Sequence, residues 1–369
     1  MSDGLDSLRA PGRVAAPDEG ITIDELRLAS RNHALPMELL RHDVTPTGSH
    51  YVLTHYDIPD VDPSTWRLDV DGAVERPLKL DLAALRAMPA QTVRVTMECA
   101  GNGRAALIPR PLSQPWLNGA VGTADWTGVP LALLLERAGV AEEATDLVLT
   151  GLDHGIERGT EQDYQRGLSL ADAAASDALV VHEMNGVPLP PQHGFPVRLV
   201  VPGWYGMGNV KWLHRITVAT EPFAGFQNRA YRLRQEAGDE GEPVSRIEPR
   251  ALVEPPGFPD FMTRTRVVRP GPTTLRGRAW SGWAPVERVE VSTDDGTTWR
   301  EAGLGPDLGR WAWRAFDIPW EAEPGEHSLR ARAYDGSGRV QRLDPAWNRG
   351  GFANNADQPV LVVVPGRGS

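Results

Sequence analysis

The sequence predicts an α+β domain followed by a β-sandwich domain, and three observations carry this prediction. The 369 residues are more than one hydrophobic core usually holds. Residues 236–259 are rich in Gly, Pro and charge without apolar periodicity, which is typical of a linker. Helix and strand patterns mix before this break, whereas short alternating segments separated by turns follow it. The 12 Trp and 32 Pro also favour a β-rich, loop-rich protein.

The chain divides into an N-terminal arm (1–45), a first domain (46–245) and a second domain (246–369). The residues before Ile21 are rich in Ser, Asp, Gly and Pro and are expected to form a flexible arm. Beyond them, Ile23, Leu26 and Leu28 fit one short helix or strand.

Helices of the first domain are expected where a capping residue precedes an apolar stripe. They are residues 82–88, capped by Asp81; residues 127–138, stopped by Gly139; and a helix that opens at the capping box of residues 169–172. Strands are expected where apolar residues alternate or cluster. They are residues 51–59, 66–70, 93–97, 147–149, 178–184, 187–189, 195–201 and 210–218. Asn185-Gly186 predicts a tight hairpin, and residues 116–126 are expected to form an irregular wall.

The second domain shows its clearest strand patterns at residues 289–291, 311–316 and 329–334, with a further short strand at 359–365. Ser292, Asp294, Gly296 and Trp299 have the spacing of a hairpin turn in which Ser and Asp bond the backbone, and we interpret them as structural.

Composition excludes several classes of function. A formal net charge of −11 argues against non-specific nucleic-acid binding. No apolar run approaches the length of a membrane span, so no membrane is expected. A single cysteine excludes an internal disulfide, and the N-terminal residues lack an export signal, so the expected location is cytoplasmic.

The only cysteine, Cys99, lies in Met97-Glu98-Cys99-Ala100-Gly101-Asn102-Gly103-Arg104. The strand before it delivers the thiol to a loop, where the two glycines permit sharp turns and close approach to a ligand. Arg104 places a fixed positive charge near a sulfur that must be a thiolate to bind metal. The alternative is a buried structural cysteine beside a turn.

Two other chemistries remain open from the residues alone. A Cys–His hydrolase would need an imidazole near Cys99, which His55, His154 or His193 could supply. A phosphorylated ligand would suit His193, Arg198 and Lys211, because all three side chains donate charged hydrogen bonds. Their alternative is a set of solvated charges at strand edges.

An ordered set of motifs resembles the sulfite-oxidase family of molybdenum enzymes. It covers most of the chain from about residue 45 onward. The matching stretches are Glu98-Cys99-Ala100-Gly101-Asn102-Gly103-Arg104, Pro115-Trp116, Gly151-Leu152-Asp153, Glu183-Met184-Asn185-Gly186, His193-Gly194-Phe195-Pro196-Val197-Arg198, Val210-Lys211-Trp212-Leu213, Trp347-Asn348-Arg349-Gly350-Gly351 and Asn354-Asn355. The resemblance implies a molybdopterin-binding α+β domain followed by an immunoglobulin-like domain that forms a homodimer contact.

The resemblance also implies roles for single residues. Cys99 would be the one protein ligand of the molybdenum in a molybdenum–molybdopterin cofactor, a sensible partner because thiolates are soft ligands. The cofactor-binding residues would be His55, Asn102, Asp153, His193, Arg198 and Lys211, and the substrate pocket would hold the catalytic residues Arg104, Trp116 and Tyr231. The implied reaction is oxygen-atom transfer to or from a small oxyanion.

The sequence departs from the family pattern where an anion would bind. Leu53 stands where the family usually has an arginine, Ser281-Gly282-Trp283-Ala284-Pro285 offers none, and Gly208 replaces another. Sulfite, oxidised to sulfate, is the default substrate; the alternative is a neutral or organic S-oxide or N-oxide. A third possibility is a cofactor-free Cys hydrolase or binding protein. No haem module is visible, so a separate electron carrier is expected.

Overall fold

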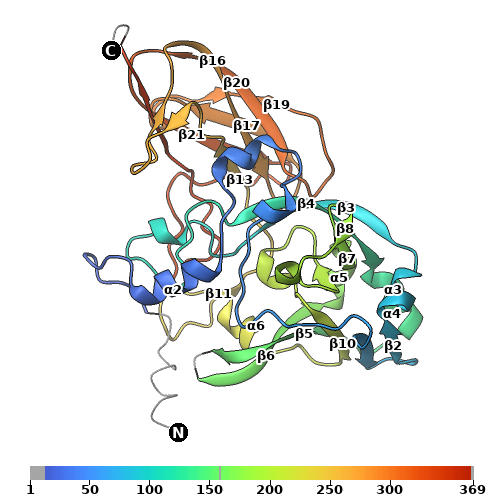
Figure 1. Cartoon of the computed structure of the whole chain (residues 1–369). Coiled ribbons are helices and arrows are strands. Elements are labelled where there is room, and N and C mark those ends of the chain that lie inside the picture. Colours follow the sequence, from blue (N-terminus) through green and yellow to red (C-terminus); the bar gives the residue numbers. More distant parts are fainter. Residues whose placement is uncertain (1–12, 158, 367–369) are drawn as a thin grey trace.

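In the computed structural model, which describes residues 13–157 and 159–366, two β-rich bodies lie against each other (Figure 1). The first body contains two five-stranded sheets, a two-stranded sheet of β11 (Arg232–Leu233) and β12 (Glu242–Pro243), and all the α-helices of the described part. The second contains two more sheets, drawn in orange and red at the top of Figure 1. The fold class predicted from the residue patterns, a region of mixed helices and strands followed by a β-rich region, is confirmed.

One sheet of the first body is built from strands that alternate buried and exposed residues, as in β1, whose Leu68 and Val70 point into the core. Its strand order is β2-β1-β10-β5-β6. The bounds are β1 Arg67–Gly72, β2 Leu78–Asp81, β5 Asp146–Glu157, β6 Thr160–Ser169 and β10 Leu213–Ala219.

The other sheet of the first body carries the cysteine strand. Its path is β3-β4-β7-β8, with β9 paired to β7. The bounds are β3 Gln91–Glu98, β4 Val121–Pro130, β7 Leu179–Met184, β8 Val187–Pro188 and β9 Arg198–Val200. Asn185 and Gly186 have φ of 54° and 77°, so the expected hairpin is confirmed.

Strand β4 was not expected. The prediction of an irregular wall holds for residues 116–120 but is wrong for 121–126, and the helix expected from residue 127 begins only at Leu131, because β4 runs from Val121 to Pro130. Its glycines suggested turns, yet they serve close packing: a Cβ on Gly122 would lie 2.6 Å from the His50 ring, and one on Gly128 would lie 2.3 Å from a backbone oxygen. The strand expected at 51–59 is also absent, and only Val52 forms an isolated bridge there.

The helices are short; α3 and α5 begin at their predicted caps, and α4 ends at its predicted stop. Asp81 accepts a hydrogen bond from the backbone of Ala84, Ser169 accepts one from Asp172, and Gly139 ends its helix with φ of 70°. The α-helices are α2 Ile23–Arg31, α3 Leu82–Arg86, α4 Leu131–Ala138, α5 Leu170–Ala175 and α6 Phe226–Ala230. The 3₁₀ helices are η2 Met37–Arg41, η3 Thr47–Ser49, η4 Arg104–Ala106, η5 Pro191–His193 and η6 Gly206–Gly208.

In the second body, two mostly antiparallel sheets pack on each other around apolar residues such as Leu275, Phe316 and Leu329. One sheet has the order β13-β16-β20-β19, with bounds Arg250–Val253, Gly271–Trp280, Arg314–Ala322 and Gly303–Leu304. The other has the order β14-β15-β22-β21-β17-β18, with bounds Phe258–Pro259, Arg266–Val267, Val360–Val364, Gly325–Asp335, Val286–Ser292 and Arg300–Glu301. In the hairpin turn before β18, Ser292 and Asp294 accept backbone N–H groups, as expected.

The segment expected to be a linker contains strands. A hairpin of β11 (Arg232–Leu233) and β12 (Glu242–Pro243) is followed by β13, which is buried throughout. The prediction failed because β13 has only three apolar residues beside Arg250, too few for a visible alternation. The boundaries at 45 and 245 stay predictions.

The N-terminal segment packs on both bodies. Residues 1–12 of the expected flexible arm lie outside the described residues. Beyond them Val14 pairs with Pro111, and Leu35 and Leu40 are buried in the main core. Arg278 of β16 donates to the carbonyl of Leu40 at 2.6 Å, so the described part of this segment contacts both bodies. Within the described residues, no helix is long and apolar enough to cross a bilayer.

Candidate active site

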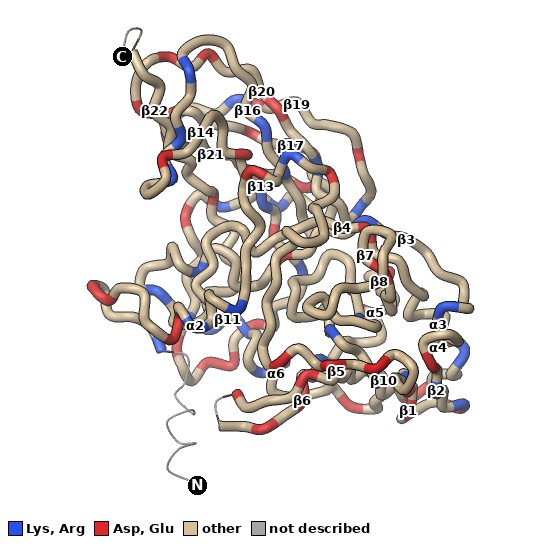
Figure 2. The backbone as a smooth tube through the Cα atoms, in the orientation of Figure 1, with Lys and Arg blue, Asp and Glu red and all other residues tan. Residues whose placement is uncertain are grey.

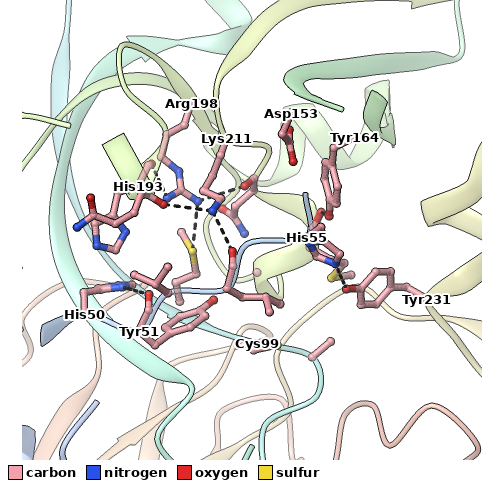
Figure 3. A pocket seen from close by; sticks show the side chains of 18 residues that line it. His50, Tyr51, His55, Cys99, Asp153, Tyr164, His193, Arg198, Lys211 and Tyr231 are labelled. Atoms are coloured by element: carbon pink, nitrogen blue, oxygen red, sulfur yellow. Dashed lines mark hydrogen bonds between the residues drawn. The ribbon is translucent and has the colours of Figure 1, made fainter. Parts of the chain in front are cut away.

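A cavity of about 630 Å³, including the open solvent at its mouth, lies in the first body beside Cys99 (Figure 3). Its walls come from the segment after η3, the end of β3, the β5 bend, η5, β9 and the loop before β10. Of the sequence-predicted site residues, the cavity brings together Cys99, His55, Asp153, His193, Arg198, Lys211 and Tyr231. Arg104, Trp116 and Asn102 are not among its lining residues.

The cysteine lies at the end of β3, where the chain turns. Its backbone N–H donates to Ala120 at 2.9 Å, and its carbonyl accepts from Asn102 at 3.0 Å, so the loop folds back on β4. Gly103 needs its left-handed φ of 84° to complete the turn. Burial raises the pKa of the Cys99 thiol, while the Arg104 charge and the Trp116 indole act to lower it. The thiolate is therefore favoured only if a further positive centre lies beside it.

Arg198 and Lys211 form the basic side of the cavity, and both are held by neutral oxygens. Arg198 donates to the carbonyls of His193 at 3.0 Å and Asn209 at 3.1 Å, and Lys211 donates to Leu53 at 2.9 Å. Neither has a carboxylate within salt-bridge distance in the described part of the chain. Burial lowers the pKa of Arg198 to about 10 and that of Lys211 to about 7. Asp153, on the same cavity wall, acts to raise the pKa of Lys211, but burial outweighs it. Buried cations with so little compensation are costly, so the arrangement suits an anionic ligand.

Two imidazoles and one carboxyl on the same walls have unused polar atoms. His193 Nε2, His50 Nε2 and Asp153 Oδ1 are buried and have no hydrogen-bond partner in the described structure. Burial lowers the pKa of His193 to about 2 and that of His50 to about 4, so both rings are neutral near pH 7. Burial raises the pKa of Asp153 to about 7. Such atoms are usually satisfied by a ligand or a water, which fits a polar ring system in the cavity.

The far wall of the cavity consists of His55 and two tyrosines. His55 Nε2 lies 3.0 Å from the hydroxyl of Tyr231, and its ring lies 5.0 Å from that of Tyr164. Burial raises the pKa of the Tyr231 hydroxyl well above its usual range, so the group is a neutral donor.

Arg104 and Trp116 lie behind the cysteine loop. The Arg104 guanidinium donates to the carbonyls of Gly350 at 2.8 Å and Gln114 at 3.1 Å, and burial lowers its pKa. Trp116 is buried in the cluster that contains Cys99. The side chain of Asn102 bonds Glu98 and the backbone of Ala120, so its polar atoms support the loop.

Glu98, the residue before the cysteine, anchors this loop to the second body. It forms a 2.6 Å ion pair with Arg250 of β13, and both side chains are at most 3% exposed. Trp280 of β16 donates to the other carboxylate oxygen at 2.8 Å. Arg250 also donates to the carbonyl of Asn354, whose amide donates to Gly103 at 3.1 Å. The two bodies therefore meet at the cysteine loop.

Sequence reasoning missed His50, Tyr51, Tyr164 and Gln192, which also line the cavity. One signal could have found His50: its ring packs against Gly122, a position without a side chain. That contact becomes visible only once β4 is known to be a strand and its register with β3 is known. The other candidate base, His154, is exposed and bonds Asp163 and Glu161, away from the cysteine.

Comparisons with known proteins agree with this geometry. Residues 55–227 match the family model of the oxidoreductase molybdopterin binding domain, and residues 259–364 match the Mo-co oxidoreductase dimerisation domain. Mitochondrial sulfite oxidase of Mus musculus is 35% identical over 94% of this chain and 67% of its own length. Sulfite oxidase of Gallus gallus is 38% identical over 87% of this chain and 73% of its own length. Sulfane dehydrogenase SoxCD from Paracoccus pantotrophus has a similar structure, with a TM-score of 0.77, 25% identity and coverage of 95% of this chain and 92% of that one.

These matches replace the hypothesis of a cofactor-free hydrolase or binding protein. The orphaned atoms of His193 and Asp153, the uncompensated Arg198 and Lys211, and a single cysteine at the same cavity fit a pterin with a phosphate and a bound metal. The sequence, the fold and the cavity agree that the chain belongs to the sulfite oxidase family of molybdopterin-dependent oxidoreductases.

Proposed function

We propose that this enzyme transfers an oxygen atom to or from a small oxyanion at a molybdenum–molybdopterin cofactor, with sulfite to sulfate as the default reaction. One observation carries the proposal: the same cavity has a lone thiol on one side and, on another, two buried cations whose side chains donate to carbonyl oxygens. The relatives named as sulfite oxidases support the choice of substrate.

Different residues would bind different parts of the cofactor. Cys99 would be the protein ligand of the metal, and Arg198, Lys211 and His193 would hold the phosphate and the pterin ring. The cofactor, when bound, supplies the two-electron redox chemistry. The cradle of Gly194, where a Cβ would lie 3.1 Å from Lys211 and Arg198 side chains, lets the backbone approach the same place.

The proposed substrate side lies between the thiol, Tyr231 and His55. Tyr231 would donate a hydrogen bond from its hydroxyl, whose high pKa keeps the proton in place. Arg104 and Trp116 would act from behind the loop: Arg104 adds positive charge near the thiol, and Trp116 excludes water.

A second candidate substrate is a neutral or organic S-oxide or N-oxide. It is favoured by Leu53, which lines the cavity and offers no charge to a dianion. Each charge-assisted hydrogen bond that an anion loses costs about 1.5 to 3 kcal/mol. A substrate panel with dye acceptors and donors decides between the two, since robust turnover of sulfite at low concentration excludes the second candidate as the main substrate.

Metal analysis tests the cofactor assignment. Protein made in a cofactor-competent, molybdenum-replete host should hold about one Mo per chain, because one thiol and one cavity serve the site. Cys99→Ser should lose oxygen-transfer activity while pterin is retained, since Arg198, Lys211 and His193 are unchanged. Thr96→Ser, a buried change on the same strand, is the matched control and should keep both. Consistent absence of Mo from the wild-type protein would contradict the proposal.

The proposed homodimer has a candidate surface in the second body. Strand pairing places Phe258, Val267 and Val363 in one cross-strand row, and Leu361 lies two residues away on β22. Phe258 and Leu361 are each 57% exposed, and the neighbouring Phe261 and Met262 are 82% and 80% exposed. Such a contiguous apolar face is typical of a protein interface. The match to a dimerisation domain model supports a second copy as the occupant.

Light scattering tests the dimer. Phe261→Asp should shift the wild-type dimer to a monomer, because a carboxylate cannot be buried unpaired in an apolar contact. Ile108→Asp, at a residue of the first body that is 84% exposed, is the matched control and should leave the mass unchanged. A monomeric wild-type protein would remove the homodimer without affecting the cofactor proposal.

We also propose a cytoplasmic location, an immunoglobulin-like topology for the second body and a separate electron carrier. The location is suggested by the single free cysteine, which suits a reducing compartment. The topology is suggested by two packed sheets of short strands. A separate carrier would take up or supply the electrons of the redox chemistry that the cofactor would provide. Fractionation, comparison of strand order with an immunoglobulin domain, and reduction of added cytochrome would test the three in turn.

A further inference from the structure

The side chain of Asn32, at the end of helix α2, joins three segments that are far apart in the sequence. Its amide nitrogen donates to the carbonyl of Leu28 at 3.0 Å and to Oε1 of Gln114 at 2.9 Å. Its amide oxygen accepts from the backbone N–H of Thr54 at 2.8 Å. Asn32, Thr54 and Gln114 are each at most 6% exposed. The amide therefore uses both of its N–H groups and one oxygen lone pair, which is close to the full capacity of an asparagine.

One end of this bridge is a wall of the candidate active site. Thr54 stands between Leu53 and His55, and both of these residues line the cavity. The carbonyl of Leu53 accepts from Lys211 at 2.9 Å, and Nε2 of His55 lies 3.0 Å from the hydroxyl of Tyr231. The residue that Asn32 holds is therefore flanked on both sides by residues of the site.

This wall is irregular, so no sheet or helix fixes its position. Val52 forms an isolated bridge with His33, and residues 53–55 belong to no helix or strand. Of the three backbone N–H groups at 53–55, only that of Thr54 has a hydrogen bond within the described part of the chain. Its acceptor is the side chain of Asn32, which makes that side chain the main restraint on this part of the wall.

The other end of the bridge is the support of Arg104. The backbone carbonyl of Gln114 accepts from Nη1 of Arg104 at 3.1 Å, and the side chain of Gln114 is the group that Asn32 holds. Arg104 is buried, and its other hydrogen bond goes to the carbonyl of Gly350 at 2.8 Å. Asn32 therefore connects the support of Arg104 with the segment that contains His55.

The stability of α2 does not account for these contacts. The helix begins with its own capping box, in which Thr22 and Glu25 exchange hydrogen bonds, and Glu25 is its only buried residue. In Figure 2, α2 carries charged residues of both signs at the edge of the first body. Two of the three Asn32 hydrogen bonds leave the helix and reach buried partners 22 and 82 positions away. Residue 32 also precedes the matched stretch 55–227, so the family match assigns it no task.

We propose that Asn32 is a positioning residue, which holds the wall at residues 53–55 and, through Gln114, the guanidinium of Arg104 in a fixed position relative to each other. Movement of either group would leave a buried polar atom unpaired, which is costly. Their contacts with a substrate form before the chemical step, so Asn32 contributes to substrate binding more than to turnover. The inference rests on the proposed function, because it takes His55 and Arg104 as residues of the substrate side.

The test variant is Asn32→Leu, which is similar in size and removes all three hydrogen bonds. Gln114→Leu breaks only the arm toward Arg104, because the bond from Thr54 to Asn32 remains. The matched control is Thr22→Ala, which weakens the other end of the same helix by removing the cap bond from the backbone of Glu25. Hydrogen exchange of residues 51–56 is measured in the cofactor-free protein. Mo content, kcat and KM for sulfite are measured in protein from a cofactor-competent host.

In Asn32→Leu the amide of Thr54 should exchange about tenfold faster or more, because its acceptor is lost. The KM for sulfite should rise about tenfold, whereas kcat per bound Mo should change less than about threefold. Gln114→Leu should raise KM without faster exchange at Thr54, and Thr22→Ala should change neither quantity. A role in folding alone would lower the Mo content and leave KM unchanged in the molecules that keep Mo, and this result would overturn the inference.

The exchange measurement separates this inference from the proposed function. It decides whether Asn32 holds the wall in the cofactor-free chain, whether or not the wild-type protein takes up Mo. Equal exchange at Thr54 in the wild-type protein and Asn32→Leu would overturn the inference, and so would an equal rise of KM in Asn32→Leu and Thr22→Ala. Absence of Mo from the wild-type protein, together with faster exchange in Asn32→Leu, would contradict the proposed function alone.

Discussion

Two groups of buried cations in this molecule have opposite surroundings. The first group is Arg250, in the hydrogen-bond network between the two bodies. Arg250 is fully buried and forms a 2.6 Å ion pair with Glu98. Trp280 donates a hydrogen bond to the other oxygen of the same carboxylate. In the cavity beside Cys99, Arg198 and Lys211 are also buried, but their side chains donate to carbonyl oxygens and form no ion pair within the described residues. A carboxylate of the chain itself neutralises the first group, whereas the second group has no directly bonded carboxylate and suits an anionic ligand.

The difference separates residues that hold the fold from residues that hold a ligand. A paired buried charge is satisfied before any ligand arrives, so its removal harms the fold. An unpaired buried cation weakens the free protein, and its removal harms binding instead. Burial alone would not have distinguished Arg250 from Arg198, because both are hidden from solvent.

The largest expected effect is at the interdomain pair. Arg250→Met should lower the free energy of unfolding by about 3 to 5 kcal/mol, because it leaves the Glu98 carboxylate buried without a counter-charge. Chemical denaturation of the cofactor-free protein measures it. The double variant Glu98→Gln with Arg250→Met should recover part of the loss. A cost below 1 kcal/mol for Arg250→Met would show that the pair is not a structural link.

The next effect should have the opposite sign. Lys211→Met should stabilise the cofactor-free protein by about 1 to 3 kcal/mol near pH 7, because it removes a buried charge whose pKa is lowered to about 7. The wild-type protein should gain stability relative to the variant as pH rises above 7, where the folded lysine loses its proton and the unfolded one keeps it.

Lys79→Met, at a side chain that is 70% exposed, is the matched control for Lys211→Met and should change stability by less than about 0.5 kcal/mol. The pterin content of Lys211→Met purified from a cofactor-competent host should fall. A variant that is both less stable and fully loaded with pterin would contradict the comparison between the two groups of cations.

A smaller effect is expected at His193, whose neutral imidazole lines the cavity beside Cys99. Burial lowers the pKa of His193 to about 2, so between its ordinary value of 6.5 and about 2 the unfolded chain binds a proton that the folded chain does not. The wild-type protein should therefore lose about 1.4 kcal/mol more per pH unit than His193→Gln as pH falls through this window. Urea denaturation at pH 7, 6 and 5 measures the difference.

His154→Gln supplies the opposite control for this pH series. Hydrogen bonds to Asp163 and Glu161 raise the pKa of His154, so its contribution to stability is present below its ordinary pKa and disappears as pH rises through the folded value. Parallel pH profiles for the wild-type protein and His193→Gln would mean that the imidazole is accessible to protons in the folded chain.

Much of the candidate site could be predicted from the sequence, but the contacts around Glu98 and Arg250 that join the two bodies could not. Cys99, His193, Arg198 and Lys211 were found because each lies in a short contiguous motif that resembles the family pattern, although Cys99 is far from the other three in the chain. Arg250 was assigned to a linker, because its contact with Glu98 spans 152 positions and no local pattern records it. Strand β4 was missed for a related reason: its glycines fit against His50 and Val180, and a glycine that serves close packing looks like a turn until the register is known.

The smallest expected effect tests whether the network reaches the cysteine. The Asn354 amide donates to the carbonyl of Gly103 at 3.1 Å, and this contact crosses from the second body to the cysteine loop. Asn354→Ala should cost about 1 kcal/mol, the usual value of one neutral hydrogen bond. If the second body holds the loop, the cofactor-free variant should also react faster at Cys99 with a thiol reagent, because local opening exposes the sulfur. Asn348→Ala, which removes contacts within its own loop, is the matched control; equal thiol reactivity in both variants would mean that the loop is held by the first body alone.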